Sequence, residues 1–462
     1  MSQYDYDVIV VGAGPGGSAC ATMCAKKGLN VALVERAAVP GQKNMSGSML
    51  FLPVMRRIWP DVDDAPWLYN YPTIEGGDMG FMADDGWSFT LGVHFGADII
   101  YDAPMVFRNE TDQWMAEQAV KAGAHLLCEC ARDLIIEDDF IKGIIVDDGK
   151  KITAPLVCAC DGFNSLMAKR SGLAPVRQDR GGRGIGEGIT QAIKYCYYMG
   201  EEKVASLGTA EKWEDGHYHD YSSMPVWSGI GEGGAWTAHA LAVPARGLIT
   251  VAVYQHVSDL CKSKANIHQR MAWFLSIPQN AHRLEGEELT YFETHLLTWE
   301  RAHAVSDKTY RNGFLLFGDA AGMINAFDGY GADAAMVCGI YAAELAEECK
   351  QKNDYSENVL SRFEDMWKND FIGRNEELPF ELGRFLFEKE PDAGEGLRDV
   401  IDACMRGKFA GDAYIDWFAD PQCISGMLRI APQLNRALPM LVPMLQNINA
   451  LGTNLLGGLI NG

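Results

Sequence analysis

A glycine pattern near the start of the chain constrains the fold more than any other feature. Gly12, Gly14 and Gly17 follow the apolar run Val8–Val11 in the spacing G-x-G-x-x-G, and a helical pattern covers residues 18–27. In such a unit the first glycine permits a tight turn, the second lets the backbone approach a pyrophosphate, and the third lets helix and strand pack closely. The free N–H groups at the start of the helix then hold the phosphates.

A second apolar run completes this unit. Residues 30–34 predict a buried strand, and Glu35 stands at its end with Arg36 beside it. An acid in that place accepts hydrogen bonds from the ribose of a bound nucleotide. Strand, turn, helix, strand and acid together predict a site for an adenine dinucleotide, without saying which one.

Length and charge exclude several classes of protein. The chain has 462 residues, which predicts two or three domains. Its formal net charge of −22 argues against nucleic acid as a partner. The acidic N-terminus fits no signal peptide, and no apolar run approaches the ~18 residues of a membrane span. These features favour a cytoplasmic protein.

The 12 cysteines are scattered and form no C-x-x-C pair, so we expect reduced thiols and no metal site. Two of them share one side of the first helix, and four form C-x-C pairs in strand-like stretches. We interpret all six as small buried hydrophobic residues: Cys20, Cys24, Cys128, Cys130, Cys158 and Cys160.

Local patterns predict several further elements. Residues 107–123 have helical spacing, with Asn109 and Thr111 as capping residues, and residues 125–144 predict strands around a turn at 137–139.

Other stretches predict turns and loops. Residues 56–72 are rich in tryptophan, proline and acids, which favours surface loops, and Gly76-Gly77 favours a turn. A second match to the glycine pattern, in Gly229, Gly231 and Gly234, has no helix or acid after it, so we interpret it as a loop.

Three later motifs follow the first unit in a fixed order. Arg108 precedes the predicted helix, Asp161-Gly162 ends an apolar strand, and Gly318-Asp319 is followed by Gly329-Tyr330-Gly331. This set resembles the FAD-dependent oxidoreductases of the aromatic-hydroxylase fold over roughly residues 5–350. The loop from Pro40 to Gly47 resembles one branch of them, which contains electron-transfer flavoprotein:quinone oxidoreductases, their Fix-type bacterial relatives and geranylgeranyl reductases.

The resemblance implies a site for FAD. It places the pyrophosphate at the three glycines of the first unit, the adenosine ribose at Glu35 and Arg36, and the flavin beside Lys43 and Asn44. It also implies contacts of FAD with Arg108 near its phosphates, with Asp319 along the ribityl or pyrophosphate portion, and with Gly331 at the pyrimidine edge. Asp161 is a further candidate, for which an ordinary structural role is equally consistent. Independently, Gly331 precedes a helical pattern from about Ala332 to Lys350, whose positive end would stabilise a reduced flavin.

The resemblance also implies an α/β fold in three parts. A Rossmann-like FAD-binding domain would comprise residues 1–72, 101–176 and 303–352, and a β-rich substrate domain residues 73–100 and 177–302. A helical C-terminal region would follow at 353–462. Its apolar stretch 438–459 is expected to pack on the core, with peripheral contact to a membrane as the alternative.

Catalytic groups are harder to predict. Tyr330 and Asp328 lie near the flavin by motif, and Tyr330 is the favoured proton donor. Candidates from the β-rich part are His239, His256, His295 and Glu187, although an ordinary structural role is the better expectation for each histidine.

The resemblance implies electron transfer between a redox partner protein and a quinone, or reduction of a C=C bond in an apolar substrate. The partner would be an electron-transfer flavoprotein or a ferredoxin-like protein, because residues 353–462 contain only Cys404 and Cys423 and cannot supply four ligands to an iron–sulfur cluster. An NAD(P)H-dependent monooxygenase or halogenase acting on an aromatic substrate is the alternative, although no W-x-W-x-I-P motif is present. A flavin-stabilised subunit of a redox complex, without a substrate of its own, is a third interpretation.

Overall fold

The predicted strand–helix–strand unit is present in the structure, which is a computed structural model, and lies within its six-stranded sheet. Strand β1 (Val8–Val11) lies parallel to β2 (Val31–Val34), and α1 (Pro15–Lys26) connects them. Both strands are completely buried, which explains why their sequences are apolar at every position instead of alternating.

The structure describes most of the chain, in these ranges: 4–42, 48–68, 70–71, 76–82, 88–94, 104–174, 189–207, 211–212, 218–219, 226–231, 234–297, 305–324, 331–370, 372–373, 399–400, 403 and 420–431.

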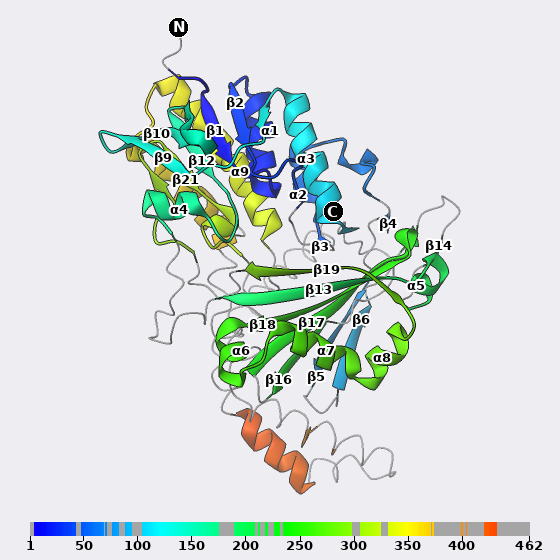
Figure 1. Ribbon diagram of the computed structural model, residues 1–462. Helices are drawn as coiled ribbons and strands as arrows, with labels where there is room; N and C mark the ends of the chain where they lie inside the picture. Colours follow the sequence, from blue (N-terminus) through cyan, green and yellow to red (C-terminus); the bar gives the residue numbers. More distant parts are fainter. Residues whose placement is uncertain are drawn as a thin grey trace, which may run out of the picture.

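A six-stranded sheet in the order β20-β21-β12-β1-β2-β8 grows from this unit. Its other four strands come from segments that are distant in the sequence. They are β8 (His125–Leu127), β12 (Leu156–Ala159), β20 (Tyr310–Arg311) and β21 (Phe314–Leu316). On one side lie α1, α3 (Arg108–Ala122) and α9 (Ala332–Lys352), and on the other a small sheet of β9 (Asp133–Glu137), β10 (Phe140–Ile145) and β11 (Lys151–Thr153) (Figure 1).

A second, seven-stranded sheet has the order β19-β13-β18-β17-β16-β5-β6. Its strands are β5 (Gly76–Met82), β6 (Ser88–His94), β13 (Thr190–Tyr198), β16 (Val226–Gly231), β17 (Gly234–Val243), β18 (Leu248–His256) and β19 (Glu288–Leu297). Neighbouring strands are antiparallel except for the parallel pair β5 and β16.

One face of this large sheet is covered by three helices, α6 (Val257–Ser263), α7 (Ile267–Ser276) and α8 (Pro278–Leu284). Ile193 of β13 and Val253 of β18 pack there against Met271 and Phe274 of α7. Strands β19 and β13 lie nearest to the six-stranded sheet and its helices, which we call the nucleotide-binding half (Figure 1). On the other face of β13, Cys196 clusters with Phe107 of that half, and Ala192 clusters with Ile324.

The remaining elements are short. They are α2 (Leu52–Ile58), α4 (Leu166–Ser171), α5 (Glu201–Leu207), α10 (Glu357–Leu360), α11 (Arg362–Lys368), β3 (Ser48–Met49), β4 (Asn70–Tyr71), β7 (Met105–Val106), β14 (Glu211–Lys212), β15 (Tyr218–His219), and the 3-10 turns η1 (Val62–Asp64), η2 (Asp147–Gly149), η3 (Pro244–Arg246) and η4 (Gly318–Ala320). Residues 421–431 form one more helix.

The structure confirms a mixed α/β fold, with a six-stranded sheet that is parallel except for β20, and helices toward the C-terminus. The domain boundaries remain a prediction, and the apolar stretch 438–459 lies outside the described residues. Among the helices that the structure describes, none is both long and apolar enough to cross a membrane.

Three local predictions are wrong, and a fourth is only partly right. The stretch 56–72 has exposed residues as expected of surface loops, but Trp59, Val62 and Trp67 are buried with α2 against α3 and α9. Asn109 and Thr111 lie inside α3, whose N-cap is Phe107.

The glycine-rich loops are strands. Gly76-Gly77 opens β5, and Gly229, Gly231 and Gly234 belong to the hairpin of β16 and β17. Pairing along a sheet satisfies these backbone groups, and no local pattern reveals such pairing.

The cysteines follow the prediction in part. Cys20, Cys24 and Cys158 are buried, whereas Cys128 is exposed and Cys130 and Cys160 are partly buried. Among the described residues, no group of three or more His, Cys, Asp or Glu side chains could hold a metal ion.

Candidate cofactor-binding site

The turn between β1 and α1 is tightly packed at Gly17 and open at Gly14. A Cβ atom added to Gly17 would lie 1.8 Å from the carbonyl oxygen of Gly12, so only glycine allows this approach of helix and strand. A Cβ atom on Gly14 would meet nothing within 4 Å. The backbone at Gly14 thus faces open space at the N-terminus of α1, where a phosphate can approach the free N–H groups.

Glu35 is positioned at the carboxyl end of β2 by two backbone hydrogen bonds. Its Oε2 accepts from the N–H of Ala13 at 3.0 Å, and its Oε1 accepts from the N–H of Ala37 at 2.9 Å. Each carboxylate oxygen can accept a second hydrogen bond, so ribose hydroxyls can still bind. Arg36 is exposed beside it.

The N-terminus of α9 meets Asp319 at the carboxyl end of the six-stranded sheet. Gly331 is the N-cap of α9, and a Cβ atom on it would lie 3.1 Å from Oδ1 of Asp319. The two ends of the third predicted motif, Asp319 and Gly331, therefore come together. The positive end of this 21-residue helix points to the same corner.

Arg108 lies at the start of α3 and forms an ion pair with Asp112. Gly41 packs directly on it, because a Cβ atom on Gly41 would lie 2.9 Å from the carbonyl oxygen of Arg108. The pairing of β3 with β7 fixes the chain just after the loop. Both ends of the loop 43–47 thus lie at the start of α3.

Asp161 has a clear local role. Its carboxylate accepts hydrogen bonds from the hydroxyl of Ser165 at 2.5 Å and from the N–H groups of Leu166 at 2.9 Å and Met167 at 3.2 Å. These contacts cap α4, while burial raises the pKa of the carboxyl group. Contact of Asp161 with the cofactor stays a prediction.

The large sheet presents a second set of polar groups to this corner. Lys194 lies between Ala192 and Cys196 on one face of β13, since alternate residues of a strand share a face. Ala192 packs with Ile324, which follows η4, and Cys196 packs with Phe107, the N-cap of α3. Lys194 therefore lies between the region of Asp319, near the N-terminus of α9, and the region of Arg108, at the N-terminus of α3.

The charge of Lys194 is poorly solvated. The side chain is 3% exposed, and burial lowers its pKa to about 8, against the attraction of Glu293. Glu293 is directly opposite Lys194 on β19, and His295 is opposite Ala192. Burial likewise lowers the pKa of His295, while Asp319 acts in the opposite direction.

Sequence reasoning missed Lys194 and Glu293. The signal was a single charge inside the otherwise apolar and aromatic run AIKYCYY, at a position that shares a face with small buried residues. Of the histidines considered, His295 lies on this face, and His256 at the end of β18 is paired with Thr190, with Nδ1 3.2 Å from Oγ1.

Several predicted site residues cannot be placed. Lys43, Asn44, Asp328 and Tyr330 lie outside the described residues, as does Glu187. Their roles stay predictions, and so do the cofactor contacts of the residues that the structure does describe.

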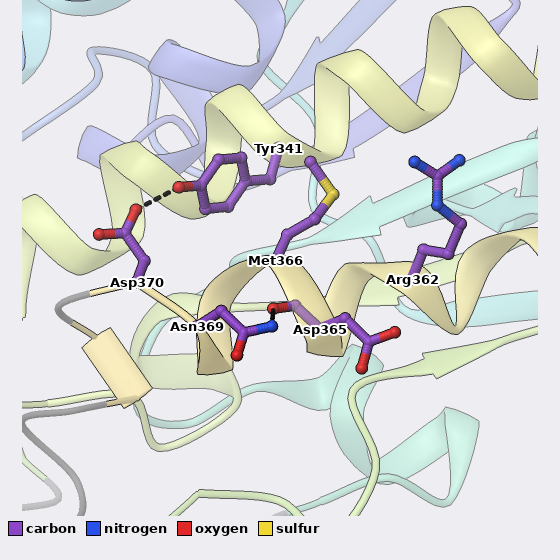
Figure 2. Close-up of a pocket in the computed structure, with 6 residues that line it drawn as sticks. All are labelled: Tyr341, Arg362, Asp365, Met366, Asn369 and Asp370. Carbon is purple, nitrogen blue, oxygen red and sulfur yellow. Dashed lines mark hydrogen bonds between the residues drawn. The ribbon is translucent and has the colours of Figure 1, made fainter.

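A pocket of about 480 Å³ lies elsewhere, between α9 and α11 (Figure 2). Tyr341 of α9 donates a hydrogen bond to Asp370, and the side-chain amide of Asn369 donates to the carbonyl oxygen of Asp365 at 2.7 Å. The pocket contains none of the predicted site residues, so it is not part of the candidate site.

Comparisons with known proteins identify relatives over most of the chain. The protein FixC of Azotobacter vinelandii is 27% identical over 351 residues, covering 75% of this chain and 76% of that protein. The protein FixC of Salmonella typhi is 27% identical over 367 residues, covering 79% and 81%.

Solved structures support the fold. A geranylgeranyl bacteriochlorophyll reductase-like protein from Thermoplasma acidophilum superposes with a TM-score of 0.70 at 20% identity, covering 94% of this chain and 99% of that one. A flavin-dependent brominase superposes with a TM-score of 0.63 at 17% identity, covering 87% and 92%.

The family match is the most direct comparison. Residues 7–314 match the family described as FAD dependent oxidoreductase, a range that contains the first glycine unit, Glu35 and Arg108. The open backbone at Gly14 and the acid at the end of β2 suit the dinucleotide that this family uses. The chain belongs to the FAD dependent oxidoreductase family and is an oxidoreductase with FAD as its cofactor.

Proposed function

We propose that this oxidoreductase passes electrons from a redox partner protein to a quinone. The observation that carries the proposal is the similarity to FixC proteins over about three quarters of both chains, together with the loop from Pro40 to Gly47 that resembles the same branch. An electron-transfer flavoprotein or a ferredoxin-like protein would be the donor. The acidic net charge of −22 suits a basic docking face on that partner.

Within this proposal the residues of the chain have separate tasks. The N-terminus of α1 at Gly14 would bind the pyrophosphate of FAD, and Glu35 would bind the adenosine ribose. Gly331 and the N-terminus of α9 would lie at the flavin, which supplies the hydride chemistry when FAD is bound. The positive helix end would stabilise negative charge there and so favour the acceptance of electrons.

Reduction of a C=C bond in an apolar substrate is a second candidate. The likeness to a geranylgeranyl bacteriochlorophyll reductase-like protein across 94% of this chain favours it, although at 20% identity that likeness concerns the fold. The brominase shares the same fold at a lower TM-score. A halogenase or monooxygenase acting on an aromatic substrate is therefore the alternative that the experiment has to distinguish from electron transfer to a quinone.

An anaerobic titration of the FAD-loaded protein, followed by flavin absorbance, tests the proposal. NADH and NADPH are added first, with and without aromatic compounds, and we expect the flavin to stay oxidised. The flavin is then photoreduced and mixed with a soluble quinone, which should restore the oxidised spectrum. Rapid bleaching by NADPH that an aromatic compound accelerates would instead identify a monooxygenase or halogenase.

A further inference from the structure

A buried lysine lies on the sheet face that is directed toward the cofactor site. Lys194 is 3% exposed, and its neighbours on the same face of β13 contact both corners of the nucleotide-binding half. Ala192 packs with Ile324 beyond Asp319, and Cys196 packs with Phe107 before Arg108. An ammonium in that place faces the region between the N-termini of α3 and α9.

Groups on three elements, β19, α3 and β13 itself, influence the charge of Lys194. From β19, Glu293 favours the ammonium form, as Cys196 does from β13 itself, whereas Arg108 at the start of α3 opposes it. Tyr254 of β18 lies on the same face, and burial raises the pKa of its hydroxyl, so it remains neutral.

His295 extends this cluster toward the nucleotide. It lies opposite Ala192, and its pKa responds to Asp319 in one direction and to Arg108, Lys194 and Arg36 in the other. The charged groups of the sheet and of the nucleotide-binding half therefore act on one another. Negative charge that arrives at this site will favour the ammonium form of Lys194.

We propose that Lys194 is the proton-donating residue of the acceptor site: its ammonium holds the proton that is delivered to the quinone, and where the amine is neutral it takes that proton up when the bound FAD is reduced. This rests on the proposed function. Reduction of a quinone to a quinol needs two electrons and two protons. The bound cofactor would supply both electrons and one proton as a hydride, and the second O–H bond forms as an Nζ–H bond of Lys194 breaks. The quinone is reduced, the cofactor is oxidised, and the amine regains its proton from solvent.

The pH dependence of the flavin midpoint potential tests the proton site without any substrate. Wild type is compared with Lys194→Met, which keeps the length of the side chain, and with Lys194→Arg, which keeps the charge but does not titrate. Lys262→Met is the matched control, because Lys262 lies on α6, which covers the opposite face, and its side chain is 57% exposed.

We expect wild type to take up one proton more per electron pair than Lys194→Met above about pH 8, where the amine of the oxidised protein becomes neutral. Lys194→Arg should lose the extra proton but retain a higher potential than Lys194→Met, and Lys262→Met should match wild type. Parallel potential–pH lines for wild type and Lys194→Met would overturn the assignment. Flavin absorbance and thermal unfolding show whether each variant is folded and loaded.

Stopped-flow reoxidation by a soluble quinone gives a second readout. Lys194→Met should react about 100- to 10,000-fold more slowly than wild type, as expected for loss of a positioned proton donor. If quinone does not oxidise wild type but the extra proton is present, the proposed acceptor is wrong and the proton site stands. If quinone oxidises wild type and Lys194→Met equally fast, Lys194 does not donate the proton and the proposed function stands.

Discussion

Arg108 holds the carboxylate of Asp112 in a two-pronged ion pair, with Nε 2.7 Å from Oδ1 and Nη2 2.8 Å from Oδ2. The side chain of Asp112 is completely buried, whereas that of Arg108 is 21% exposed. Because the two residues are one helical turn apart on α3, the ion pair holds the guanidinium against the first turn of the helix. The side chain of Arg108 is therefore oriented by the protein itself.

Removal of Arg108 should be costly to the fold. Arg108→Met removes this cation from the completely buried carboxylate of Asp112, so we expect the free energy of unfolding to fall by about 3 kcal/mol. Arg56→Met is the matched control, because Arg56 and Asp63 form an ion pair with 35% and 46% exposed side chains, worth at most about 1 kcal/mol. Urea unfolding measures both, and equal losses would show that burial of Asp112 is not decisive.

The first glycine unit predicts two different outcomes for the same substitution. Gly14→Ala adds a Cβ atom to open space, so the fold should persist while the affinity for FAD falls at least about tenfold through obstruction of the phosphates. Gly17→Ala places a Cβ atom 1.8 Å from the carbonyl oxygen of Gly12 and should prevent stable folding. Circular dichroism and flavin content separate the two, and unchanged FAD binding by Gly14→Ala would contradict this site.

The stability of the protein should depend on the protonation of Lys194. Its pKa is lowered from 10.5 to about 8 in the folded state, so the unfolded chain binds more protons between these values. Stability therefore rises with pH across that window, by about 3 kcal/mol when the whole lowering is counted. Below about pH 8 the full penalty of burying the charge is present.

Denaturant unfolding at several pH values checks this dependence. The difference in unfolding free energy between Lys194→Met and wild type should be largest near pH 7 and should shrink as the pH approaches 10.5. A difference that stays constant with pH would mean that Lys194 is solvated in the folded protein.

The tryptophan cluster at α2 should carry part of the core stability. Trp59 is 2% exposed, lies 5.7 Å from the ring of Trp114, and donates a hydrogen bond to Thr22. Trp59→Ala should lower the free energy of unfolding by about 3–5 kcal/mol. Tyr198→Ala, at a side chain that is 51% exposed, should cost less than about 1 kcal/mol. Comparable costs would show that the cluster is not a tight core.

Elements governed by neighbouring residues were predictable from the sequence. The turn at Gly12, the acid at Glu35 and the extent of α9 all depend on spacing within about 30 residues, where helix periodicity and glycine geometry act directly. The meeting of Asp319 with Gly331 followed from the resemblance, because both belong to motifs with a fixed order.

Features that depend on distant contacts were not predictable. Trp59 is buried because α3 and α9 pack on it, and Lys194 is buried because the sheet face at Ala192 and Cys196 meets the nucleotide-binding half. A tryptophan beside prolines, or a lysine in a strand, carries no local sign of which face will be covered. Tertiary packing overrides local preference at such positions.

The most direct test of the central proposal is the competition between a quinone and dioxygen for the electrons of the reduced protein. The FAD-loaded chain is photoreduced without oxygen and mixed in a stopped-flow instrument with a soluble quinone or with dioxygen at equal concentration. Our account predicts that quinone reoxidises the flavin at least about 100-fold faster, because the site would bind and protonate the quinone. Rapid reoxidation by dioxygen together with slow reoxidation by quinone would contradict it and would favour the monooxygenase.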